Sequence, residues 1–454
     1  MKKLLFTLSI LAAFAMQATA QSFQSGDLLY SVIGSNPPRV SLDGHVDGTA
    51  AQGPLHIPDT VEYQGKSYAV AEITARAFYD CRYLSGDLVI PSTVKRIGKR
   101  AFCLTLMSTL TLPNSVIEID REAFRSTRFS GTLVIPNGLE RLDSGVFWDS
   151  PGFTGDLVIP ESVTYVGDSA FAGCSGFDGQ LIIEGMVQSI GKSAFHGCSN
   201  LTGDLLIPES VVDVGAGAFY KCSGFNGILS LPTQLTEIHE RCFDECSGFA
   251  GSLVIPESVT TIEDYAFMRC GFSGELVIPN NVVSVGLGAF AQCSGITDLV
   301  LVGNVERMEY LAFSNLTGLQ SIKINVETPP ELHSLTFANV PRDIPVYIPC
   351  NTIELYQNAD HWSEFTNFIE DCSLVVDEDG SVEVRVYPNP ASDFVTIEGI
   401  EAVEMQVFNA VGQLVETVHH TNQIAVSGWA KGVYVVKIMG NDGFVCTKRI
   451  AVVG

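Results

Sequence analysis

Residues 157–174 read LVIPESVTYVGDSAFAGC, and this stretch decides the fold of most of the chain. Residues 205–222 repeat it residue type for residue type, and a third close copy surrounds Pro256. The Phe of the Ala-Phe pair recurs at spacings of 22 to 24 residues. Its twelve positions are Phe78, Phe102, Phe124, Phe147, Phe171, Phe195, Phe219, Phe243, Phe267, Phe290, Phe313 and Phe337. Such regular self-similarity predicts a repeat architecture and not one compact core.

Each copy has the pattern of one short coil. Leu157 and Ile159 alternate across a short strand, and the Pro that follows ends its pairing. Val163 and Val166 mark a second extended or turn segment, and Ala-Phe-x-x-Cys has the spacing of a short helical turn. Glycine-rich pieces such as residues 175–179 return the chain to its starting side. A unit this small is stable only when stacked on its neighbours, which predicts a solenoid of about twelve coils.

The repeat pattern resembles that of the BspA-like leucine-rich repeat family, also called the Treponema-type repeat. That pattern is L-x-I-P-x-x-V-x-x-I-G-x-x-A-F-x-x-C, and the resemblance covers about Leu55 to Val340. It implies a leucine-rich-repeat solenoid of short strands and turns, and adhesion to host proteins or to other bacteria. Glu184 and Val302 depart from the pattern, because they stand where Pro is usual. Other residues stand at or near the Cys position, namely Thr127, Ser150, Leu316 and Val340.

Both ends of the repeat region have the pattern of caps, which an open solenoid needs to cover its terminal apolar surfaces. Between Pro58 and Pro91 the spacing grows to 33 residues, because residues 62–68 insert a β-hairpin pattern. At the far end a last degenerate strand precedes residues 354–369, whose aromatic side chains can cover the final coil. We therefore expect an N-terminal cap with hairpin and first coil over 21–80, the solenoid over 81–345 and a C-terminal cap over 346–376.

After Cys372 the pattern changes to alternating strands separated by tight turns. This change predicts a linker over 377–385 and a small antiparallel β-sandwich over 386–454. The second module resembles the type A sorting domain of the type IX secretion system of certain Gram-negative bacteria. The residues that carry the resemblance are Tyr387, Pro388, Asn389, Pro390, Gly412, Gly432, Tyr434 and Lys448. It implies recognition by the outer-membrane translocon, whereas strand alternation alone would also fit an adhesive or carbohydrate-binding immunoglobulin-like domain.

The first twenty residues predict export. A basic start at Lys2 and Lys3 precedes an apolar run, and the small residues Ala18 and Ala20 predict signal-peptide cleavage before Gln21. A membrane anchor is the alternative, but the run is shorter than the roughly 20 residues that span a bilayer. Together with the sorting domain, this segment predicts a location on the outer-membrane surface or outside a Gram-negative cell, with no transmembrane segment after cleavage.

The net charge of −25 is spread along the chain and not gathered in a tail. Such a surface repels phosphate backbones and anionic lipid headgroups. We therefore expect neither nucleic acid binding nor simple electrostatic membrane binding.

Twelve cysteines in an exported chain would ordinarily indicate disulfide bonds. Seven of them occupy one position of the repeat, which predicts a buried column of reduced thiols packed as small apolar residues. These seven are Cys81, Cys174, Cys198, Cys222, Cys246, Cys270 and Cys293. Bridges between neighbours in this column are the alternative. Cys350 and Cys372 flank the C-terminal cap and are the better candidates for a disulfide bond.

Two groups of residues imitate reactive sites. His239, Cys242 and Cys246 have the residue types and the short spacing of a zinc site, and His196 beside Cys198 could pair a base with a nucleophile. Drift of the repeat explains both groups, because Cys246 and Cys198 belong to the column. The sequence holds no His-Glu-x-x-His, Gly-x-Ser-x-Gly, phosphate-loop or dinucleotide motif. We therefore expect no enzyme, no metal and no cofactor.

The resulting hypothesis is a surface-displayed binding protein that presents an extended platform to a host or bacterial protein or a glycan. A candidate ligand-facing row at one offset after the strand consists of Tyr165, Gln188, Asp213 and Glu237. Two other classes stay open. A glycan-binding accessory protein would need exposed aromatic platforms, and a purely structural envelope protein would bind nothing saturably.

Overall fold

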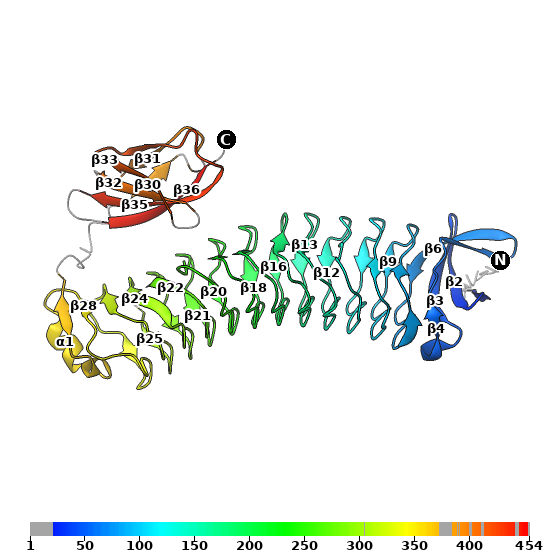
Figure 1. The fold of residues 1–454 in the computed structure, drawn as a ribbon, viewed down its shortest axis with the longest axis horizontal. Helices are drawn as coiled ribbons and strands as arrows, with labels where there is room; N and C mark the ends of the chain where they lie inside the picture. Colours follow the sequence, from blue (N-terminus) through cyan, green and yellow to red (C-terminus); the bar gives the residue numbers. More distant parts are fainter. Residues whose placement is uncertain are drawn as a thin grey trace, which may run out of the picture. The chain divides into compact units, whose positions relative to one another are not determined.

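The computed structural model describes residues 21–303, 305–371, 384–387, 389, 391–398, 402–409, 413–440 and 445–452. The chain divides into two compact units at the boundary between Asp371 and Cys372. In Figure 1 the first unit runs from blue to yellow-orange and the second from orange to red. The predicted signal peptide at residues 1–20 lies outside the described residues, as does most of the predicted linker at residues 377–385.

The first unit begins with an antiparallel meander that the repeat pattern did not predict. Its strands are β1 (Ser22–Ser25), β2 (Leu28–Ser35) and β3 (Pro38–His45). Strand β3 pairs in parallel with β6 (Lys66–Ile73), which in turn pairs with β9 (Arg96–Ile97) of the next coil. The meander therefore continues one strand ladder of the solenoid and covers the edge that the first coil would leave open.

The expected hairpin of this cap forms between β5 (Thr60–Tyr63) and β6. Tyr63 pairs with Lys66, so the loop has two residues, Gln64 and Gly65, with φ of 51° and 73°. Positive φ at both loop positions is the turn geometry whose twist matches that of the two strands.

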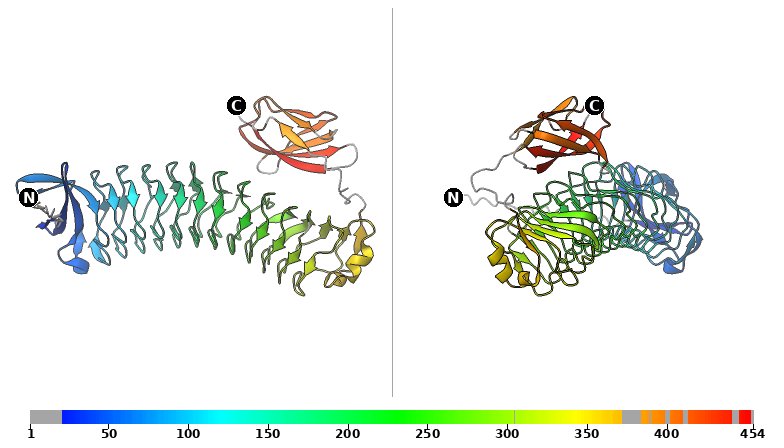
Figure 2. Two further views of the ribbon diagram at one scale, coloured as in Figure 1. Left: turned by 180° about the vertical axis from the view of Figure 1, so that it is seen from behind. Right: turned by 60° about the vertical axis from the view of Figure 1, so that its left-hand side comes forward.

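Most coils contribute short strands, and runs of these strands pair in parallel with their counterparts in the next coil, within the stack of coils in Figures 1 and 2. The segments at residues 133–135 and 253–255 form no strand. The Leu-x-Ile segments form the first ladder, with strands β8 (Leu88–Val89), β10 (Leu110–Thr111), β13 (Leu157–Ile159), β15 (Leu181–Ile183), β17 (Leu205–Leu206), β19 (Leu229–Ser230), β22 (Ser273–Ile278), β24 (Gly295–Leu301), β26 (Ser321–Ile324) and β28 (Val346–Ile348). Ahead of it lie η1 (Gly48–Ala50) and the parallel pair β4 (Gln52–Pro54) and β7 (Tyr83–Ser85).

The second ladder consists of two-residue strands after the Val of each copy. They are β9, β11 (Glu118–Ile119), β12 (Arg141–Leu142), β14 (Tyr165–Val166), β16 (Ser189–Ile190), β18 (Asp213–Val214), β20 (Glu237–Ile238), β21 (Thr261–Ile262), β23 (Ser284–Val285), β25 (Arg307–Met308) and β27 (Glu331–Leu332). In both ladders the apolar ends of the segments point inward, so each coil closes around its own small core.

The core is organised as columns of like residues. The twelve Phe rings of the repeat form one continuous stack, with neighbouring centroids 5.2 to 5.6 Å apart. All twelve are buried. The stack follows from the register, because parallel pairing of each coil with the next places every residue beside its own copy.

The prediction of a helical turn at Ala-Phe-x-x-Cys was wrong. Ala170 N–H donates to Gly167 O at 3.1 Å and Cys174 N–H donates to Phe171 O at 3.0 Å, which are turn contacts three residues apart. Phe171 N–H instead donates to Ala194 O of the next coil at 2.8 Å. Alternate amides are committed between coils, so the i to i−4 pattern of an α-helix cannot form.

The column cysteines are unpaired and buried. Each thiol from Cys174 onward lies 3.0 to 3.2 Å from the carbonyl oxygen of the Phe in the preceding coil, as Cys222 does with Phe195 O. Ser150 takes the same role, because its hydroxyl donates to Phe124 O at 2.9 Å. Most copies therefore have a small hydrogen-bond donor at the column position, whereas Leu316 and Val340 fill it with an apolar side chain.

The C-terminal end of the solenoid is covered by α1 (Ile353–Asn358), η2 (Trp362–Glu364) and β29 (Phe368–Glu370). The Trp362 and Phe365 rings lie 5.7 and 5.5 Å from Phe337, the last ring of the stack. The cap thus gives the final coil the apolar partner that a further coil would have supplied. Cys350 is disulfide-bonded, whereas Cys372 lies outside the described residues, so their pairing stays a prediction.

The second unit has two small antiparallel sheets. One contains β30 (Arg385–Tyr387), β31 (Phe394–Glu398) and β34 (Gln423–Ala425). The other contains β32 (Ala402–Phe408), β33 (Leu414–His419), β35 (Gly432–Gly440) and β36 (Val445–Val452). Alternate residues such as Val395 and Ile438 are buried between them, as in a β-sandwich. No helix among the described residues of the chain is long and apolar enough to cross a membrane.

Candidate binding surface

The outer face of the first ladder carries a row of aliphatic side chains, which we call the aliphatic row. They are the middle residues of the Leu-x-Ile segments, and they point outward because side chains alternate along a strand. Val134 is 65% exposed, Val89 56%, Leu206 54% and Val254 46%. The row consists of Val89, Val134, Val158, Ile182, Leu206, Val254, Val277 and Val300.

The aliphatic row is interrupted by residues of other types. Parallel pairing sets Thr111 beside Val89 and Ser230 beside Leu206, and it sets Lys323 after Val300. The repeat therefore fixes where this row lies but not the chemistry of each of its positions.

The outer face of the second ladder is polar and holds most of the predicted ligand-facing row. Tyr165, Asp213 and Glu237 start strands β14, β18 and β20. The prediction was wrong at Gln188, because Tyr165 pairs with Ser189, which in turn pairs with Asp213. Ser189 follows Tyr165 by 24 residues, the spacing of Phe171 and Phe195, so Gln188 stands one residue too early in its copy.

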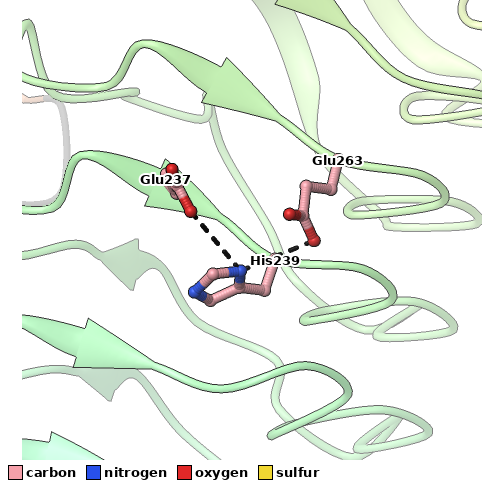
Figure 3. A group of neighbouring side chains, drawn as sticks. All are labelled: Glu237, His239 and Glu263. Carbon is pink, nitrogen blue, oxygen red and sulfur yellow. Dashed lines mark ion pairs between the residues drawn. The ribbon is translucent and has the colours of Figure 1, made fainter.

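On this face three carboxylates surround His239, as Figure 3 shows for two of them. The ring Nδ1 lies 3.9 Å from Glu237 Oε2 and 3.5 Å from Glu263 Oε2. The ring Nε2 lies 3.3 Å from Asp213 Oδ1. Ligand atoms of Glu237, His239 and Glu263 all lie within 4.8 Å of one another, a spacing that could hold a metal ion.

A shallow depression adjoins this group. Its volume is about 270 Å³, and it is lined by Glu240, Thr261, Ile262, Glu263, Asp264, Ser284, Gly286, Arg307 and Glu309. Glu263 belongs both to this depression and to the group around His239. The sequence-based analysis missed this combination, because Glu263 comes from the next coil, 24 residues after His239.

The two groups that imitate reactive sites do not assemble as such. Cys242 and Cys246 are buried, and their thiols lie near backbone carbonyl oxygens, whereas His239 faces the carboxylates outside. Cys198 is also buried and contacts Phe171 O, and burial raises its pKa well above the usual value. His196 stacks on Tyr220 at 4.9 Å, and desolvation lowers its pKa. All three thiols therefore act as structural groups.

Several outward-facing aromatic rings in the repeat region are covered by cationic side chains, whereas Tyr83 is 68% exposed and has no cation over its ring among the described residues. The Arg125 guanidinium lies 3.8 Å from the Trp148 ring centroid, and Arg241 lies 4.4 Å from that of Tyr265. Arg141 covers Tyr165 at 5.0 Å in the same way. Contacts of this kind compete with any ligand that would stack on the same ring face.

In the second unit, several residues of the predicted sorting motif tie β-strands together. Asn389 donates through Nδ2 to Arg449 O at 2.9 Å, and its Oδ1 accepts from Ala451 N–H at 2.8 Å. Tyr387 hydrogen-bonds Glu398, and Tyr434 donates to Ala430 O at 2.8 Å. Gly432 begins β35 and Lys448 lies in β36, whereas Pro388, Pro390 and Gly412 lie outside the described residues.

Comparison with known proteins matches these features to a family. Residues 66–178, 179–273 and 228–342 match the family described as the BspA type leucine rich repeat region, in six copies. The chain belongs to this family. Residues 385–453 of this BspA-type protein match the secretion system C-terminal sorting domain. The combination confirms the sequence-based assignment of both modules and implies a secreted protein of the cell surface or the extracellular space.

One solved structure supports the solenoid fold, and a second is similar over much of its length. The BspA-type chain is 21% identical to a leucine-rich repeat protein from Bacteroides ovatus, with a TM-score of 0.50 over 76% of this chain and 88% of that chain. It is 20% identical to a leucine rich cell surface protein from Faecalibacterium prausnitzii, with a TM-score of 0.47 over 80% of this chain and 98% of that chain. No curated protein matches the chain.

Proposed function

We propose that this BspA-type protein is a cell-surface adhesion protein that binds a protein partner along the aliphatic row. The observation that supports this proposal is the exposure of successive aliphatic residues on one outer face, with Val134 at 65% and Leu206 at 54%. Contiguous exposed apolar surface is typical of protein interaction sites. Because the row repeats with the coils, it offers an extended contact to a host or bacterial surface protein.

A protein partner fits this surface better than a glycan. Sugar binding usually relies on an uncovered aromatic ring face, and the Trp148 and Tyr265 faces carry Arg125 and Arg241. The aliphatic row offers no hydrogen-bonding groups for sugar hydroxyls except at positions such as Thr111 and Ser230. The two alternatives are a glycan-binding accessory role and a purely structural envelope role.

We also infer that the protein is not an enzyme. The repeat family and the neighbouring leucine-rich repeat proteins are typically non-enzymatic. The depression beside Glu263 is shallow, whereas a reaction usually needs a concave site that excludes water.

Export is proposed to follow the order of segments expected from the sequence. The signal peptide at residues 1–20 would direct the chain across the inner membrane. The sorting domain at residues 386–454 would then be read by the type IX translocon, through the residues around Tyr387 and Asn389. Deletion of residues 386–454 should abolish surface display, and unchanged display would contradict this assignment.

The binding proposal is tested with the mature chain and a variant of the aliphatic row. Val134→Lys combined with Leu206→Lys and Val254→Lys places three charges on exposed positions and leaves the core intact. The matched control is Thr236→Lys, at an exposed residue directly before strand β20. Both proteins and the parent chain are applied to arrays of extracellular-matrix and bacterial surface proteins and to a glycan array.

Saturable binding to an arrayed protein that the triple variant loses and the control keeps would support the proposal. Binding to glycans only would favour the accessory role. Binding to neither array would favour the structural role, and protein binding unaffected by the triple variant would move the contact to another face.

A further inference from the structure

The group around His239 carries an unusual excess of negative charge. Asp213, Glu237 and Glu263 all approach one imidazole within 3.3 to 3.9 Å. Among the described residues, no Lys or Arg lies within 4.0 Å of these three carboxylates. One imidazole can carry a single positive charge at most, so the group keeps an uncompensated negative charge in either protonation state of the ring.

Other coils handle the same repeat position differently. Asp120, Asp143 and Glu309 also stand directly after the second-ladder strand, and each pairs with an arginine at 3.1, 2.7 and 2.9 Å, respectively. The pair of His239 with Glu263 in successive coils is therefore not the ordinary way in which this surface balances its carboxylates.

A side chain at this position is also sterically demanding. Several coils have Gly there, and a Cβ on Gly191, Gly215 or Gly286 would come within 2.6 to 2.7 Å of backbone atoms of the preceding coil. Two neighbouring coils have His239 and Glu263 in place of this Gly. Both departures point their ligand atoms to one place (Figure 3).

The orientation of the imidazole leaves one nitrogen free for coordination. Nε2 lies 3.3 Å from Asp213 Oδ1, and Nδ1 lies 3.9 and 3.5 Å from Glu237 and Glu263. With a cation bound at Nδ1, the ring proton would sit on Nε2 and donate to the Asp213 carboxylate. A histidine held by a carboxylate at one nitrogen and open at the other is the usual arrangement of a metal ligand.

We propose that Glu237, His239 and Glu263 bind a zinc-class divalent cation, with Asp213 fixing the tautomer of His239. Zinc bonds of about 2.0 to 2.2 Å in a tetrahedron place ligand atoms about 3.3 to 3.6 Å apart. The Nδ1 to oxygen distances of 3.5 and 3.9 Å need only a small contraction to meet this value. Both distances are longer than those of a good hydrogen bond, so they do not describe a tight ion pair.

The donor set selects the kind of cation and leaves one position open. One imidazole nitrogen with two carboxylates suits zinc and similar transition metals, whereas calcium prefers six to eight oxygen ligands. Glu263 Oε2 also accepts from Glu240 N–H at 2.7 Å, which holds this carboxylate in place. The adjoining depression of about 270 Å³ gives room for water or an added donor as the fourth ligand.

The experiment measures zinc binding to the untagged mature chain by isothermal titration calorimetry after chelator treatment. Cobalt is the second probe, because its visible absorption reports tetrahedral coordination directly. His239→Gly restores the residue that other coils have at this position, so this variant keeps the fold. Glu263→Gln and Asp213→Asn test the second ligand and the orienting carboxylate.

The matched control is His333→Gly. Strand β27 and the residue after it, Glu331, Leu332 and His333, repeat the order of Glu237, Ile238 and His239. His333, however, lies beside Ser334 and Tyr310. This control accounts for zinc bound by a lone surface histidine. Circular dichroism of all variants checks that the coils are intact.

The expected result is one zinc ion per chain with a tetrahedral cobalt spectrum, both lost in His239→Gly and retained in His333→Gly. Asp213→Asn and Glu263→Gln should weaken zinc binding by roughly tenfold or more. Zinc affinity that is unchanged in His239→Gly, absence of saturable zinc binding to the parent chain, or a preference for calcium would each overturn the proposal.

Discussion

The inner columns and the outer rows of the solenoid share one register but differ in chemistry. Inside, Phe195 lies between Phe171 and Phe219 at 5.5 and 5.2 Å, and identical contacts recur along the stack. Outside, the same parallel pairing sets Tyr165 beside Ser189 and Ser189 beside Asp213. An inner residue must fit a copy of itself on both sides, whereas an outer residue only has to be compatible with solvent. Departures from the repeat are therefore most informative on the outside.

The largest expected difference between the two regions is in stability. Phe195→Ala removes a fully buried ring from the stack, and we expect a loss of about 3 to 5 kcal/mol in the free energy of unfolding. Leu206→Ala, at a position 54% exposed, should change it by less than about 0.5 kcal/mol. Urea titrations followed by circular dichroism measure both. Equal losses in the two variants would contradict the distinction between inner and outer positions.

The second prediction concerns the pH dependence of stability that the buried Cys column causes. Burial raises the pKa of Cys174 and Cys293 from the ordinary 9.0 to about 12. Between pH 9 and 12 the folded chain keeps the thiol proton while the unfolded chain loses it. The free energy of unfolding is therefore unaffected by this thiol below pH 9 and falls as the pH rises toward 12.

Each such thiol should reduce the free energy of unfolding by about 1.4 kcal/mol per pH unit within this range. The measurement compares the parent chain with Cys174→Ser under reducing conditions, because a Ser hydroxyl does not titrate there. The parent should lose stability more steeply than the variant above pH 9. Parallel pH profiles would show that this thiol is not protected in the folded state.

The third prediction concerns what stabilises the fold at the column position, the hydrogen bond from the side chain or its apolar packing. Cys222→Ala removes the thiol that contacts Phe195 O at 3.0 Å, and we expect a loss of about 1 kcal/mol. Cys222→Ser should cost less, because Ser150 already donates to Phe124 O in an equivalent place. Thermal unfolding of the two variants under reducing conditions tests the order. A Ser variant less stable than the Ala variant would show that apolar packing dominates.

The smallest expected effect lies in the N-terminal cap. Gln64 occupies the first loop position of the hairpin with φ of 51°, a region that Asn adopts more readily. Gln64→Asn should therefore raise the free energy of unfolding by about 0.5 kcal/mol. Denaturant unfolding measures the gain, and Gln64→Val, which should be destabilising, is the opposing control.

The sequence by itself determined the repeat, its phase and the residues of the inner columns. The Phe positions could be read from spacing alone, because each coil lies on the next and the same core position recurs every 22 to 24 residues. The caps and the second module were also predictable, since the periodic pattern visibly stops there. The meander of β1 to β3 was not, because it lies outside the repeat and its strands depend on pairing with β6.

Only the tertiary structure decided what the outer surface brings together. His239 and Glu263 are one repeat apart in the sequence. Only the folded structure shows that their ligand atoms lie close together. Ser189, by contrast, could be placed from the sequence, because it follows Tyr165 by the same 24 residues that separate Phe171 from Phe195. Spacing along the chain determines which residues share a column or a row. Which outer side chains turn toward the neighbouring coil is decided only in the folded stack, because spacing does not fix their orientation.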